Sequence, residues 1–295
     1  MEINYYSARG FYKYMLNRSH QRYKGSPLLI YQMGKVGSKT VQASLQSLGL
    51  DMPIYHTHIL NKARISETEL KRKKFFRTER YSYLKRPWLN QFLLKKIESS
   101  SNAKKWKIVT LTRDPIARNI STFFENLEIK VKNPAEEYEI KSDYYNIEPM
   151  IVKPGNMRKL SDLYFDRLNH DSPLVFFDRE LKSLFGVDVF ASEFSKSKGF
   201  KIYKSEKADV LVIRLENLNH CYKEAFKKFL NINSFTLENT NIGKAKVYAS
   251  IYKKFKETIH LPGNYLDKFY KSKYMRHFYS EMEIEGFREK WVRPV

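Results

Sequence analysis

Short apolar runs alternate with stretches of helical periodicity through much of the chain. Apolar runs that predict strands lie at residues 28–31, 53–60, 107–112 and near 210. Apolar residues at helical spacing predict helices at 40–48, 62–96, 157–169, 178–185, 217–230 and 241–279. This order predicts an α/β fold, with a parallel sheet, helices on both faces, and ligands at the carboxyl ends of the strands.

The remaining segments extend this core within one predicted domain, residues 1–295, a length sufficient for a single large α/β unit. Residues 1–25 are rich in Tyr, Arg and Lys and predict a short helix or arm packed on the core. Residues 128–155 lose clear periodicity and accumulate Tyr and Pro, which indicates an insertion or a lid. Residues 241–295 predict a helical C-terminal extension.

The chain is strongly basic, with 54 Lys+Arg against 32 Asp+Glu and a formal net charge of +22. This charge attracts polyanions and anionic nucleotides, but it does not choose among nucleic acid, acidic polysaccharide and anionic lipid. Residues 62–96 carry twelve Lys/Arg and three Glu. They predict helices with one strongly positive face, which is either a solvated face or a polyanion-binding surface.

Cysteine usage and hydropathy favour a cytoplasmic protein without a transmembrane segment. The single Cys221 excludes an intramolecular disulfide framework, and its place in a predicted helix favours a buried thiol over a nucleophile. No stretch approaches the roughly eighteen apolar residues of a membrane helix, and residues 1–6 lack the apolar segment of a signal peptide.

The most informative segment is Gln-Met-Gly-Lys-Val-Gly-Ser-Lys-Thr at 32–40, between a predicted strand and a predicted helix. Glycines allow backbone N–H groups to close around phosphate oxygens, and the helix that follows presents its positive end. The segment therefore predicts a P-loop-type sheet with an anion cradle. Its predicted cradle residues are Gly34, Lys35, Val36, Gly37, Ser38, Lys39 and Thr40.

A second element of the same kind covers residues 107–121, where an apolar strand ends in a basic, hydroxylated helix start. It contains Arg113, Arg118 and Ser121, and Pro115 fits the first turn of a helix, where a missing N–H costs nothing. Both elements end strands of one predicted parallel sheet. We therefore expect them to meet at the same edge.

Together these two elements resemble the sulfotransferase superfamily, which transfers a sulfuryl group from 3′-phosphoadenosine 5′-phosphosulfate (PAPS) to an acceptor. Lys35, Gly37 and Ser38 match the loop that holds the 5′-phosphosulfate, whereas Lys39 stands where a second hydroxyl is usual. Arg113 and Ser121 keep the spacing of the pair that binds the 3′-phosphate. Residues 210–218 are similar to the strand and Glu-Asp-Leu stretch found late in many members.

The resemblance implies PAPS as the donor, a hydroxyl as the acceptor and no metal. Lys35 is the candidate for neutralising charge that grows on the bridging oxygen, because a flexible ammonium can reach it. Arg113 and Ser121 would fix the nucleotide. The 5′-phosphate would be held by Ser38, Lys39 and Thr40, although the charge of Lys39 could also change which cofactor binds.

His56 and His58 are the candidates for the catalytic base. Alternation along a strand places both on one face, at the end nearest the ligand. His58 is the preferred choice, while a structural role for the pair and a glutamate base, which many family members use, remain alternatives. No Cys, His and carboxylate cluster completes a metal-binding set.

A carbohydrate acceptor is favoured over a small phenol. The surroundings of Asn241, Lys244, Lys246 and Tyr248, with residues 279–280, resemble proteins assigned to capsular polysaccharide synthesis that share the sulfotransferase signatures. The basic surface also suits an acidic glycan. Nucleic acid is not favoured as a partner, and the oligomeric state stays open.

Two other classes of function remain. Residues 38–40 approximate the end of the Gly-x-x-x-x-Gly-Lys-[Ser/Thr] loop of nucleotide-dependent kinases and hydrolases, but Met33 and Ser38 occupy its two glycine positions. The other alternative is a non-catalytic protein that binds polyanions through the basic face of residues 62–96.

Overall fold

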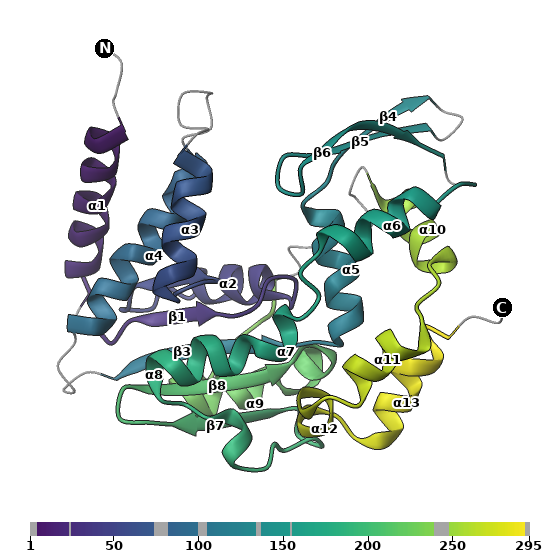
Figure 1. Ribbon diagram of the computed structural model, residues 1–295. Coiled ribbons are helices and arrows are strands. Elements are labelled where there is room, and N and C mark those ends of the chain that lie inside the picture. Colours follow the sequence, from purple (N-terminus) through teal and green to yellow (C-terminus); the bar gives the residue numbers. More distant parts are fainter. Residues whose placement is uncertain are drawn as a thin grey trace.

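The computed structural model describes residues 5–23, 25–73, 82–99, 105–133, 137–153, 155–238 and 248–292. Its centre is a five-stranded sheet in the order β2-β1-β3-β8-β7 (Figure 1). The first four strands of this order are parallel and only β7 runs antiparallel, which confirms the largely parallel α/β sheet. The strands are β1 Leu28–Tyr31, β2 Ile54–Thr57, β3 Trp106–Thr112, β7 Phe200–Lys204 and β8 Ala208–Arg214.

Helices flank this sheet, and both faces of β3 and β8 are buried because nearly every residue of these strands is shielded. Such shielding explains why the central strands are apolar runs without alternation. The helices of the first half are α1 Tyr5–Gln21, α2 Ser38–Gln46, α3 Lys62–Lys73, α4 Ser82–Ser99 and α5 Pro115–Glu125. The second half contains α6 Arg158–Arg167, α7 Ser172–Phe176, α8 Ser183–Phe185, α9 Leu218–Leu230, α10 Ala249–Thr258, α11 Gly263–Tyr270, α12 Lys273–Phe278 and α13 Glu281–Glu289.

Most predicted helices are present, with shifted ends. Within the predicted segment 62–96 the described residues form two helices, α3 and α4, which lie side by side in Figure 1 and contact each other. α1 fills most of the predicted N-terminal arm and packs around Trp88 of α4 through Tyr5 and Tyr12. Cys221 in α9 is buried, as predicted, and desolvation raises the pKa of its thiol to about 11. Within the described ranges no helix has both the length and the apolar character needed to cross a membrane.

Residues 128–155, which lack clear helical periodicity, form a second sheet. Its strands are β4 Glu128–Asn133, β5 Glu137–Ser142 and β6 Ile147–Val152, paired antiparallel. β5 alternates half-buried and buried positions, a strand signal that the prediction missed. The sheet lies apart from the main sheet, beyond the end of α5 (Figure 1).

The C-terminal helices pack into the same hydrophobic core as the main sheet. Phe278 and Tyr279 are fully buried within that core. The Arg214 guanidinium at the end of β8 donates to the Phe278 carbonyl oxygen and pairs with Glu283 of α13. These contacts fix the position of α12 and α13 against the carboxyl end of β8.

Candidate functional site

A cavity of about 1200 Å³ lies at the carboxyl ends of β1, β2 and β3. Most of its lining comes from the turn between β1 and α2, from α5, from the segment after β2, from α3 and α4, from the turn between β5 and β6, from the region of α6 and α7, and from α10. Seven of the nine predicted cofactor-binding residues line it, namely Gly34, Lys35, Gly37, Ser38, Lys39, Arg113 and Ser121. Val36 and Thr40 belong to the same β1–α2 segment but are not among the lining residues, and Val36 is fully buried.

The turn between β1 and α2 depends on left-handed backbone at two positions. Lys35 has φ 71 and Gly37 has φ 86. A side chain at Gly37 would also bring a Cβ to 2.6 Å from Cδ1 of Leu215, so the leucine side chain would have to move, and the left-handed backbone favours glycine as well. Gly37 is the N-cap of α2 and has no side chain that could cap the helix, and the N-terminus of a helix attracts anions.

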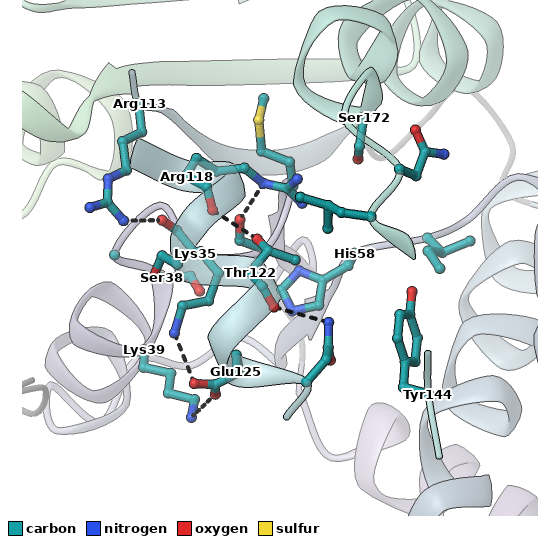
Figure 2. A pocket seen from close by; sticks show the side chains of 18 of the residues that line it. Lys35, Ser38, Lys39, His58, Arg113, Arg118, Thr122, Glu125, Tyr144 and Ser172 are labelled. Carbon is teal, nitrogen blue, oxygen red and sulfur yellow. Dashed lines mark hydrogen bonds and ion pairs between the residues drawn. The ribbon is translucent and has the colours of Figure 1, made fainter. Parts of the chain in front are cut away.

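The two predicted anion elements meet in the structure. The Arg113 guanidinium donates to the Lys35 carbonyl oxygen at 2.9 Å, and Arg118 Nε donates to the Gly34 carbonyl oxygen at 3.0 Å (Figure 2). Arg118 is 5% exposed, and burial lowers its pKa to about 10, so it stays cationic at neutral pH. No role was assigned to Arg118 from the sequence. In the structure its hydrogen bond to the Gly34 carbonyl oxygen stabilises the turn between β1 and α2.

The start of α5 is held by local capping and by residues from the far end of the chain. Asp114 caps the helix by accepting from Ile116 N and Ala117 N, with Pro115 in the first turn as predicted. The Tyr274 hydroxyl accepts from Arg113 N at 3.0 Å and donates to Arg113 O at 2.9 Å. The Glu216 carboxylate accepts from Asp114 N at 2.8 Å. The backbone beneath Arg113 is therefore fixed on both sides.

Glu125, at the end of α5, is a site residue that the sequence interpretation missed. Its carboxylate lies 3.0 Å from Lys35 Nζ and 3.8 Å from Lys39 Nζ, and both lysines point toward it in Figure 2. The Tyr248 hydroxyl donates to it at 3.2 Å. The sequence contained a signal for Glu125. Residues 118, 121 and 125 lie three and four residues apart, so they share one face of a helix that contains two of the basic or hydroxylated residues.

His56 and His58 lie together, as the strand prediction required, although β2 ends at Thr57 and His58 follows the strand. Their rings are 4.8 Å apart and both line the cavity. His58 Nδ1 lies 2.9 Å from the Gln32 carbonyl oxygen, which can only accept, so Nδ1 carries the proton and Nε2 is left as the basic nitrogen.

Burial keeps both histidines neutral. Desolvation, together with the nearby cations of Arg86, Arg118 and Lys39, lowers the pKa of His58 to about 4. Desolvation and the neighbouring His58 lower the pKa of His56 to about 3. Within the described part of the chain, no group of three or more His, Cys, Asp or Glu is placed to hold a metal ion.

These lowered pKa values predict acid sensitivity of the fold. An unfolded histidine takes up a proton near pH 6.5, whereas folded His58 does so only near pH 4. The contribution of neutral His58 to the free energy of unfolding is therefore fully present above pH 6.5. This contribution decreases as the pH falls toward 4, by at most about 1.4 kcal/mol per pH unit. We expect the free energy of unfolding, measured with urea between pH 6.5 and 5, to change less steeply with pH for His58→Gln than for the wild type.

The exposed His260 lies outside the cavity lining, so His260→Gln is the matched control for loss of one imidazole. Equal slopes in the wild type and His58→Gln would contradict the assigned protonation of His58.

Only part of the predicted C-terminal signature lies within the described residues. Asn241, Lys244 and Lys246 lie outside the described residues. Tyr248 lines the cavity, whereas the Tyr279 hydroxyl bonds to Glu216 at 3.1 Å in the core. The residue after it, Ser280, caps α13 through a capping box. Tyr248 alone, of the described members of this set, is placed to contact a ligand.

A protein-family model matches part of the chain. Residues 157–280 fit the sequence model of a family described as "Putative capsular polysaccharide synthesis protein". No curated protein and no solved structure matches the chain. The matched span supplies Glu216 and Tyr274, which fix the Arg113 backbone, and Tyr248, which bonds to Glu125. Over this span, which lies outside both anion elements, the chain is similar to a capsular polysaccharide synthesis family.

Proposed function

We propose that the protein is a PAPS-dependent sulfotransferase acting on a hydroxyl of a carbohydrate. The observation that carries the proposal is the direct contact between the two anion elements, in which Arg113 and Arg118 bond to the carbonyl oxygens of Lys35 and Gly34. These bonds hold the two elements together at one cavity, and each element contributes side chains whose chemistry suits a phosphate.

The polar and cationic side chains that line the cavity suit PAPS. Lys35, Lys39 and the Ser38 hydroxyl face the cavity around the N-terminus of α2, where a phosphosulfate would be favoured by both charge and helix dipole. Arg113 and Ser121 offer a planar fork and a hydroxyl for a static phosphate. A cavity of about 1200 Å³ exceeds the usual size of small-molecule pockets, so it has room for a nucleotide and an acceptor.

When bound, PAPS would supply a sulfuryl group attached to a phosphate leaving group. Lys35 would place its ammonium against the negative charge that grows on that phosphate. His58 Nε2 would accept the proton of the acceptor hydroxyl, because Nδ1 is committed to the Gln32 carbonyl oxygen. Anions bound near Lys39 and Arg118 would offset cations that lower the pKa of His58, and its proton affinity would rise.

Two features support a carbohydrate acceptor. The family that matches residues 157–280 is described by capsular polysaccharide synthesis. Tyr144 lines the cavity with a ring that is 69% exposed, and it packs edge-on against Tyr145 at 4.9 Å. An exposed aromatic face of this kind suits the apolar face of a sugar ring.

Calorimetry with adenosine 3′,5′-bisphosphate tests the proposal. We expect binding that does not require Mg²⁺, and we expect Arg113→Gln to weaken it about 10- to 100-fold, because a charged hydrogen-bonding pair to the 3′-phosphate is lost. Arg276→Gln is the matched control, since Arg276 is exposed on α12 and outside the cavity lining.

Three outcomes would count against the proposal: no binding of the bisphosphate, equal losses in both variants, or Mg²⁺-dependent binding of ATP in its place. Mg²⁺-dependent ATP binding would favour the kinase or hydrolase alternative. Salt-sensitive binding of polyanions without any nucleotide would favour the non-catalytic alternative.

A further inference from the structure

The cavity is far more cationic than the donor requires. The cationic side chains among its lining residues in the described part of the chain are Lys35, Lys39, Arg64, Arg86, Arg113, Arg118, Arg167, Lys253 and Lys256. Glu125 is the single carboxylate among the same lining residues. PAPS would carry roughly four negative charges at neutral pH, counting up to two on the 3′-phosphate. About half of the cationic lining would remain without an anionic counterpart from the donor.

Two groups of these cations bear on the argument. Lys35, Arg113 and Arg118 belong to the two anion elements or contact them directly. Arg64 and Arg86 come instead from α3 and α4, on the segments that follow β2. Arg86 lowers the pKa of both His56 and His58, while Arg118 lowers that of His58, so the histidines lie within reach of both groups.

Arg64 is held in place by a buried carboxylate. Its Nη1 donates to Glu180 Oε1 at 2.8 Å, and Glu180 is 1% exposed. Glu180 also accepts from Leu60 N and Asn61 N, each at 3.0 Å, just before α3 begins. The guanidinium is therefore ordered before any ligand binds, which lowers the entropic cost of recognition. Its side chain remains 42% exposed, and Arg64 is one of the residues that line the cavity.

We propose that Arg64 and Arg86 form an acceptor subsite that binds the carboxylate of an acidic saccharide. The description of this ligand as the acceptor rests on the proposed sulfotransferase function. A guanidinium fork pairs with a planar carboxylate through two parallel hydrogen bonds, which a neutral sugar cannot supply. Thr68 and Asn90, which also line this side, add polar groups suited to sugar hydroxyls. The subsite would present a neighbouring hydroxyl of the saccharide to His58.

The test is calorimetric binding of a hexasaccharide of alternating glucuronate and N-acetylhexosamine, without nucleotide, compared with its carboxyl-reduced form. We expect the wild type to bind the glucuronate form at least tenfold more tightly. The double variant Arg64→Gln/Arg86→Gln should lose this preference. Its binding of adenosine 3′,5′-bisphosphate should stay within about twofold of the wild type, because neither arginine belongs to the two anion elements.

The control Lys223→Gln/Lys227→Gln removes the same charge from exposed positions of α9 that do not line the cavity. It should keep the preference. Equal affinity of the wild type for both hexasaccharides, no binding of either, or an equal loss in the control would overturn the subsite. Tighter binding of a sulfated, carboxyl-reduced hexasaccharide than of the glucuronate form would assign it to sulfate esters and overturn the carboxylate assignment.

The two proposals fail separately. A glucuronate preference that depends on Arg64 and Arg86, without any binding of the bisphosphate, would retain the saccharide subsite and refute the sulfotransferase. Binding of the bisphosphate without a glucuronate preference would support the sulfotransferase proposal and refute the saccharide subsite.

Discussion

Replacement of Lys35 by alanine is expected to lower kcat for sulfuryl transfer about 100- to 1,000-fold, the usual cost of removing one group that stabilises transition-state charge. Lys35 is the cation within the turn between β1 and α2, and its ammonium lies beside the Glu125 carboxylate, which also lines the cavity. An acceptor panel assayed with labelled PAPS gives the rate, and the melting temperature reports the fold. Turnover equal to the wild type would refute the role of Lys35.

The backbone at Lys35 calls for a second variant. Its φ of 71 is unfavourable for alanine as well as for lysine, so Lys35→Ala keeps the local strain while removing the charge. Lys35→Gly removes the charge and relaxes the strain. If the ammonium is what matters, both variants lose activity equally. Recovery of activity in Lys35→Gly would instead assign the effect to the conformation of the turn.

Replacement of Glu180 by alanine is expected to lower the free energy of unfolding by about 3 kcal/mol or more. The carboxylate is buried and accepts from the Tyr31 hydroxyl, from Leu60 N and Asn61 N, and from Arg64. Its removal leaves several buried donors without an acceptor, and each such donor costs about 1–3 kcal/mol. Urea unfolding at pH 7 measures the change, and the saccharide preference should fall with it because Arg64 loses its anchor.

Asp178→Ala is the control for this effect. Asp178 is exposed and lies two residues before Glu180 in the same π-helical turn, Phe177–Lys182. Its removal changes the net charge identically but should alter stability by no more than about 0.5 kcal/mol. A similar loss in both variants would mean that charge balance, rather than the buried hydrogen bonds, makes Glu180 important.

Local signals in the sequence were sufficient for the elements that build the cradle. Two glycines after a buried apolar run predicted the β1–α2 turn, and at Gly37 the left-handed backbone and the close approach to Leu215 both favour glycine. Pro115 marked the first turn of α5. Because β1, β2 and β3 are parallel neighbours, the ends of these strands necessarily share one edge.

The prediction missed the second sheet, and two of its strands, β4 and β6, leave only a weak signal in the sequence, although β5 alternates clearly. β6 contains Pro149 and several exposed positions, so it lacks the alternation that marks a strand with one buried face. Val131 in β4 and Ile151 in β6 are each more than half exposed. Strands with weak burial leave a weak hydrophobic pattern in the sequence.

By itself, the sequence determined the largely parallel α/β core, the two turns with their helix starts, and the pairing of His56 with His58, since each depends on neighbouring residues or on strand order. Tertiary structure alone decided which polar groups meet across the chain. Glu180 reaches Tyr31, Leu60 and Arg64, and Tyr274 brackets Arg113, over separations at which no periodicity exists. Such partners are selected by how helices pack on the sheet, so they become visible only after the chain has folded.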